Sequence, residues 1–112
     1  MKKYKQYEIK KTISLQEALE NIKSNYNIAT RYLVYIYKGF NCASCDRKAS
    51  FARLERHKKS TSKRNHYNFY CNDGMMMTVD HIVPRSKGGI NKLSNMQPMC
   101  ENCNSKKSDN ML

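Results

Sequence analysis

The residue types best suited to chemistry gather in the C-terminal third of the chain. In chain order they are an Asp-His pair, a Gly-Gly pair, a lone Asn and a Cys-x-x-Cys pair with a second Asn, namely Asp80-His81, Gly88-Gly89, Asn95 and Cys100-Glu101-Asn102-Cys103-Asn104. Carboxylate and amide oxygens are ligands that suit Mg²⁺ or Mn²⁺. An imidazole has a pKa near neutrality and can take a proton from water. The combination fits metal-assisted hydrolysis.

Four of the five cysteines form two Cys-x-x-Cys pairs, Cys42/Cys45 and Cys100/Cys103. This spacing lets two thiolates share one tetrahedral Zn²⁺, and all four positions would be filled, which predicts a structural zinc. Met1-Lys2-Lys3 leads into polar sequence with no signal peptide, so we expect a reducing compartment in which such pairs bind metal. A thiol redox pair is the alternative, but no βαβ pattern surrounds either pair. The fifth cysteine, Cys71, is expected to be a small buried hydrophobe.

In this order and spacing, the pieces resemble the HNH endonuclease motif, in a form whose third position is Asn rather than His. The resemblance covers about residues 39–108 and rests on Cys42-x-x-Cys45, Asp80-His81-Ile82-x-Pro84, Gly88-Gly89, Asn95 and Cys100-x-x-Cys103-Asn104-x-x-Lys107. It implies an α+β fold: a small ββα-metal (His-Me finger) nuclease core with a four-cysteine structural zinc site and an N-terminal helical extension. It also implies hydrolysis of phosphodiester bonds, usually in DNA, leaving 5′-phosphate and 3′-hydroxyl ends.

The resemblance also implies a role for each matching residue. Asp80 and Asn104 would hold one catalytic Mg²⁺ or Mn²⁺, His81 would act as general base, and Asn95 would orient the loop and His81. Asn104 in place of His should shift the metal preference toward Mg²⁺. Near such a site, four basic side chains would hold the nucleic-acid backbone: Arg85, Lys87, Lys106 and Lys107.

Each of these features also has a plainer interpretation. His81 could be a partly buried structural histidine, and the basic side chains could simply be solvated. A non-catalytic zinc-ribbon nucleic-acid-binding protein would keep the cysteines and the charge without needing Asp80, His81 or Asn104. Adjacent residues on a regular strand point to opposite faces, so Asp80 and His81 can share a site only if the strand end is twisted or bulged.

The charge of the chain favours a polyanionic partner. The 112 residues have a formal net charge of +12, and most of the excess lies in residues 47–112. Charge alone does not separate DNA from RNA or anionic lipid, or from a charge that serves only solubility, and DNA is the partner that the resemblance implies. No apolar run approaches the length of a membrane span. We expect one domain, a monomer by default, and a cytoplasmic location, in the host cell if the gene belongs to a phage.

The N-terminal part, residues 1–38, is expected to be a helical and apolar extension of a core at residues 39–112. Residues 1–12 should be a frayed lead-in. Ser14 and Glu17 form a capping box that predicts a helix from about Leu15 to Asn25. Residues 28–40 are apolar on nearly every face, which leaves helix and strand both open.

Within the core, Ser50–Lys59 is expected to form a short helix, followed by an exposed basic loop that could contact phosphate. Asn72-Asp73-Gly74 separates two β-forming runs, residues 67–71 and 75–82, which predicts a hairpin. A further helix should begin at Glu101.

Overall fold

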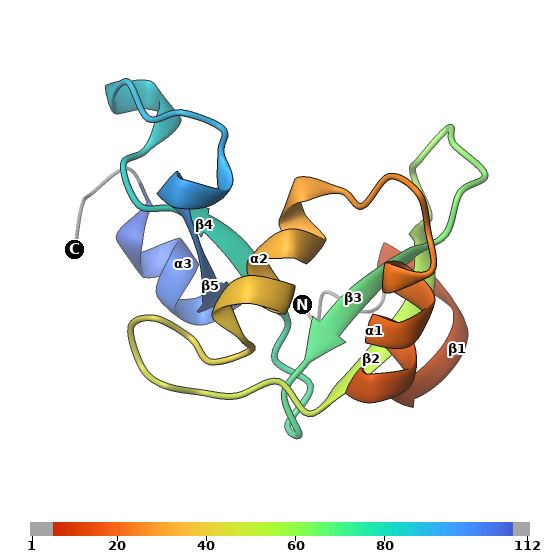
Figure 1. Cartoon of the computed structure of the whole chain (residues 1–112). Coiled ribbons are helices and arrows are strands. Elements are labelled where there is room, and N and C mark those ends of the chain that lie inside the picture. The colour runs from red at the N-terminus through yellow and green to blue at the C-terminus, as the bar shows by residue number, and fades with distance from the viewer. Residues whose placement is uncertain (1–5, 109–112) are drawn as a thin grey trace.

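A computed structural model describes residues 6–108, and the fold is α+β, as predicted. Two small antiparallel sheets and three α-helices make up this described part of the chain (Figure 1). The strands are β1 Tyr7–Ser14, β2 Phe51–His57, β3 His66–Tyr70, β4 Met77–His81 and β5 Met96–Cys100, and the helices are α1 Leu15–Lys23, α2 Thr30–Lys38 and α3 Glu101–Lys107.

The first sheet has the strand order β1-β2-β3 and corrects two predictions. Residues 7–14 are not a frayed lead-in but an edge strand, and residues 51–57 are not a helix but the central strand. In both cases the backbone hydrogen bonds come from distant segments, which local sequence patterns do not reveal. The sheet also crosses the expected boundary at residues 38 and 39, because β1 pairs with β2.

The second sheet contains only β4 and β5 and carries α3. The two strands pair antiparallel from Met77 opposite Cys100 to His81 opposite Met96. Helix α3 begins at Glu101, as predicted, directly after β5, with the Cys100 thiol accepting from the Cys103 N–H as N-cap. The arrangement is the expected ββα core.

The predicted hairpin between residues 67–71 and 75–82 is wrong beyond its turn. The turn itself forms, with Gly74 at φ 90° and the Gly74 N–H donating to the Cys71 carbonyl. After one bridge between Tyr70 and Met76, however, the two runs separate into different sheets. Strand β3 pairs with β2 and strand β4 pairs with β5, and both pairings are longer than the single bridge. The turn therefore connects the two sheets.

Helix α2 settles the open choice at residues 28–40 and lies between the two sheets (Figure 1). On one side the ring of Tyr35 packs against Phe69 of β3, with centroids 4.7 Å apart. On the other side the Lys38 ammonium donates to the Leu93 carbonyl at 2.8 Å and also to that of Met96. The helix thus fixes the ββα core against the first sheet.

Helix α1 forms as predicted and ends at Lys23. Its N-cap is Ser14, whose hydroxyl accepts from the Glu17 N–H at 3.1 Å. Ala18 and Ile22 are its buried residues. Among residues 6–108, no helix combines the length and hydropathy that crossing a membrane requires.

Candidate active site and metal centre

A hollow of about 260 Å³ lies where β4 ends and α3 passes beside it. Asp80, His81 and Asn104 all border it, together with Arg85 of the following loop. The chain turns away from the sheet immediately after His81, the last residue of β4. Asp80 and His81 can therefore both reach the hollow, although they are adjacent in sequence. They come together there with Asn104, as the motif predicts.

Asp80 is the buried anion of this site, with 5% of its surface exposed. The Lys107 ammonium lies 3.2 Å from each carboxylate oxygen. The Gln97 side chain also donates to Oδ2 at 3.0 Å. Each carboxylate oxygen has two lone pairs, so Asp80 keeps acceptor capacity for a cation.

Lys107 does not lie where a phosphate contact requires it. It is 2% exposed, and its ammonium also donates to the carbonyls of His81 and Ile82, at 2.8 and 3.3 Å. These acceptors, with the Asp80 carboxylate, surround the charge inside the protein. The sequence-based assignment of Lys107 to nucleic-acid binding is therefore corrected: this lysine neutralises Asp80 and holds the end of β4.

Asn104 of α3 borders the same hollow. Its Nδ2 donates to the Thr78 hydroxyl at 2.8 Å, and that hydroxyl donates to the Met99 carbonyl at 2.7 Å. This chain of hydrogen bonds orients the amide and uses its nitrogen. Within residues 6–108, no donor is paired with its Oδ1. A carboxylate and a free amide oxygen fit a hard divalent cation such as Mg²⁺.

His81 is half-buried and is oriented by a residue that the motif did not indicate. Its Nε2 lies 3.0 Å from Asn91 Oδ1. When that oxygen accepts, Nε2 carries the proton and Nδ1 is left as the basic nitrogen. Asn91 lies on the loop between β4 and β5. Nothing in its local sequence distinguishes it from a solvated turn residue.

Asn95 is buried and closes the loop that carries Asn91. Its side chain accepts from the Val83 N–H at 2.9 Å and donates to the carbonyls of Val83 and Ile90, at 3.1 and 2.8 Å. Its backbone carbonyl also accepts from the Ile82 N–H. These contacts join both ends of the loop just beyond His81.

The Gly-Gly pair serves this loop in two different ways. Gly88 has φ 89°, as expected for a turn glycine. Gly89 has no positive φ, but a Cβ there would lie 1.8 Å from the Val83 carbonyl oxygen. Gly88 therefore supplies the positive φ of the turn, whereas Gly89 is needed for a close approach of backbone.

Three of the predicted nucleic-acid contacts are at the surface. Arg85 borders the hollow, Lys87 lies on the same 3₁₀ turn, and Lys106 lies on the outer side of α3. All three are exposed.

The four paired cysteines come together into a second candidate metal site. The thiol sulfurs of Cys42, Cys45, Cys100 and Cys103 all lie within 4.8 Å of one another. The first pair follows α2 and the second connects β5 to α3, so an ion here would join elements far apart in sequence. The set could hold a structural metal such as zinc. Cys71 is separate and buried, as predicted.

The cysteine thiols differ in acidity. Desolvation opposes ionisation of Cys42, yet backbone hydrogen bonds from Cys100, Cys45 and Ser44 lower its pKa to about 6. Desolvation raises the pKa of Cys100 to about 12. The Cys42 thiolate forms easily, whereas the raised pKa values of Cys100 and Cys103 oppose ionisation there, and a bound divalent cation would stabilise the thiolate forms.

A comparison with protein families connects this geometry to a known group. The family model described as HNH endonuclease matches residues 42–110, which include both cysteine pairs and the hollow at the end of β4. Neither the search of curated proteins nor that of solved structures found a match. With more than half of its length matched, the chain belongs to the HNH endonuclease family.

Proposed function

We propose that the protein is a metal-dependent endonuclease that hydrolyses phosphodiester bonds in DNA. The observation that carries the proposal is the convergence of Asp80, His81 and Asn104 on one hollow in a chain of this family. The net charge of +12 favours a polyanionic substrate.

Each residue has a defined task in this proposal. Asp80 and Asn104 would hold one Mg²⁺ or Mn²⁺, which when bound supplies charge stabilisation for the phosphorane. His81 Nδ1 takes a proton from the attacking water, while Asn91 holds the other ring nitrogen. Asn95 is a positioning residue, because its hydrogen bonds go to the loop backbone rather than to the hollow.

The remaining predicted residues would bind the substrate or stabilise the fold. Arg85, Lys87 and Lys106 would hold the DNA backbone beside the scissile phosphate. The four cysteines would bind a structural Zn²⁺ that leaves no open ligand position. A phage or mobile-element origin and a cytoplasmic location stay predictions from the sequence.

The experiment compares the wild-type protein with His81→Ala on supercoiled plasmid, with Mg²⁺ and with EDTA. We expect nicking by the wild type with Mg²⁺ alone and a loss of about 10²–10⁴-fold in the variant, the usual range for a general base. His57→Ala is the matched control, because His57 lies on β2, outside the hollow. Stronger nicking with Ni²⁺ or Zn²⁺ than with Mg²⁺ would contradict the Mg²⁺ preference.

A non-catalytic DNA-binding protein is the alternative, and one observation favours it. The Asp80 carboxylate is already paired with Lys107 and Gln97, so the site is stable without a metal ion. In that case the wild type binds plasmid and never cuts it, and His81→Ala changes neither property.

A further inference from the structure

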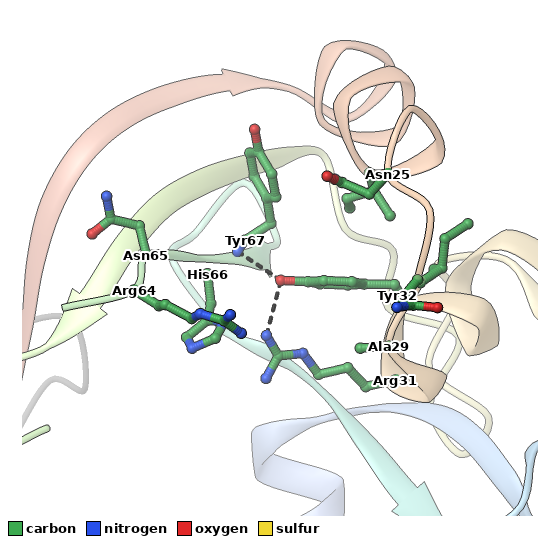
Figure 2. A pocket seen from close by; sticks show the side chains of 11 residues that line it. Asn25, Ala29, Arg31, Tyr32, Arg64, Asn65, His66 and Tyr67 are labelled. Atoms are coloured by element: carbon green, nitrogen blue, oxygen red, sulfur yellow. Dashed lines mark hydrogen bonds between the residues drawn. The ribbon is translucent and has the colours of Figure 1, made fainter. Parts of the chain in front are cut away.

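A second and larger hollow, of about 430 Å³, lies away from the end of β4. Its lining comes from the connection between α1 and α2, the first turn of α2, and the start of β3 with the residues just before it (Figure 2). In that view Arg31 enters from one side and Arg64 and His66 from the other, and their nitrogen atoms gather at one end of the hollow. The HNH motif includes none of these residues.

Tyr32 fixes the position of Arg31 in this hollow. The Arg31 guanidinium donates to the Tyr32 hydroxyl at 2.9 Å and lies 4.6 Å from the centroid of its ring. The same hydroxyl accepts from the Tyr67 N–H at 2.9 Å, which ties α2 to β3 (Figure 2). Arg31 is therefore held in place before any ligand arrives, which lowers the entropy cost of binding.

Among the described residues that line this hollow, none is acidic. Within residues 6–108, no carboxylate forms an ion pair with Arg31 or Arg64. Glu55 borders the adjoining hollow together with all three basic residues. It is 1% exposed, and its Oε2 accepts from Tyr70 and from Asn68, whereas its buried Oε1 has no hydrogen-bond partner in the described part of the chain, so one carboxylate faces two guanidinium groups and an imidazole. The cluster of two guanidinium groups and an imidazole thus presents an excess of hydrogen-bond donors to solvent.

The pKa of His66 is affected by the same positive charges. Burial and then the positive charges of Arg31 and Arg64 lower the pKa of His66. A dianion or monoanion between these groups would screen that repulsion and favour the charged ring.

We propose that Arg31, Arg64 and His66 form a second phosphate-binding site, which holds the backbone of the nucleic-acid substrate away from the scissile bond. Guanidinium forks match phosphate oxygens in geometry and charge. A third hollow, lined by Arg31, Tyr32 and Val79 among others, lies between this site and the one at the end of β4, which Val79 also borders. The inference rests on the proposed function only in taking DNA as the ligand.

The test measures binding without cleavage. In a His81→Ala background, Arg31→Gln/Arg64→Gln is compared with Lys23→Gln/Lys48→Gln, which removes the same charge from two exposed lysines outside the hollow. Fluorescence anisotropy with a short labelled DNA duplex is recorded over a range of salt concentrations. Losing one phosphate contact should flatten the slope of log K against log salt by about 0.9 and weaken binding about eightfold near 0.1 M salt.

The expected result is this loss for the arginine variant and a clearly smaller one for the lysine variant. Equal losses in both variants, or none in either, would overturn the proposal. A second readout is the NMR signal of the His66 ring, which should shift when duplex is added. A shift with inorganic phosphate but not with duplex would also overturn it, because the site would then take free phosphate rather than a strand.

The outcome is separable from that of the proposed function. A wild-type protein that binds DNA through Arg31 and Arg64 but never nicks plasmid contradicts only the nuclease. A protein that nicks plasmid but shows no specific effect of these arginines contradicts only the second site.

Discussion

Among individual residues, the ion pair between Lys107 and Asp80 has the clearest energetic consequence. Both side chains are almost completely buried, so Lys107→Met would leave an uncompensated carboxylate in the protein interior. Breaking a buried pair from one side costs about 3–5 kcal/mol. Urea denaturation at neutral pH should show a loss of this size, and added Mg²⁺ should recover part of it, since the cation can replace the ammonium beside Asp80.

The control for this prediction is the neighbouring residue. Lys106 is exposed, so Lys106→Met should change the free energy of unfolding by no more than about 0.5 kcal/mol. Similar changes in the free energy of unfolding for the two substitutions would contradict a buried Lys107–Asp80 pair.

The contact between Asn91 and His81 predicts a change in pH dependence. Asn91→Asp would place a carboxylate about 3 Å from the ring, and a neighbouring negative charge favours the protonated imidazole. If His81 acts as the proposed general base it must be neutral, so the acidic limb of the cleavage rate should move to higher pH. Asn72→Asp adds the same charge at an exposed turn and should leave the profile in place. An unchanged profile for Asn91→Asp would mean that Asn91 does not face the base.

At the level of elements, the loop between β4 and β5 predicts different costs for its two glycines. Gly88→Ala meets open space and has only the strain of positive φ, about 1–2 kcal/mol. Gly89→Ala places a Cβ 1.8 Å from the Val83 carbonyl oxygen, so the backbone must move and the loop hydrogen bonds to Asn95 must break. We expect a larger drop in melting temperature and a loss of cleavage for Gly89→Ala, with Gly88→Ala close to wild type in activity. Equal melting temperatures would contradict this loop geometry.

The elements differ in how far the sequence could predict them. Local signals were enough for α1, whose N-cap pair Ser14 and Glu17 stands in the sequence, and for α3. The strand β2 was mistaken for a helix because its partners β1 and β3 are distant in the chain. The convergence of Asp80, His81 and Asn104 on one hollow could be predicted because the motif fixes their order. The contact of Asn91 and the buried position of Lys107 could not, because they depend on how the loop and α3 pack.

Over the whole molecule, the arrangement in two sheets could not be predicted from the sequence. The turn at Asp73-Gly74 reads as a hairpin, yet it connects β3 of one sheet to β4 of the other. That outcome depends on α2, whose Tyr35 and Lys38 contact the two sheets on its opposite sides. No local pattern states which partner a strand will choose, because register and pairing are decided by packing.

The cysteine cluster leads to the prediction with the largest expected effect on the stability of the whole molecule. Cys45 is exposed, whereas Cys71 is buried. Without a metal ion, Cys45→Ala should therefore be nearly neutral, within about 0.5 kcal/mol, and Cys71→Ala should be the more harmful change. A bound zinc reverses this order, because structural zinc contributes on the order of 10 kcal/mol and losing one thiolate sacrifices much of it. We expect Cys45→Ala to unfold at much lower urea concentration than Cys71→Ala. A zinc chelator should destabilise the wild type and Cys71→Ala alike. Metal analysis should find one zinc per chain in the wild type and in Cys71→Ala. A Cys45→Ala variant as stable as the wild type, with no response to the chelator in either, would show that the four sulfurs hold no structural ion.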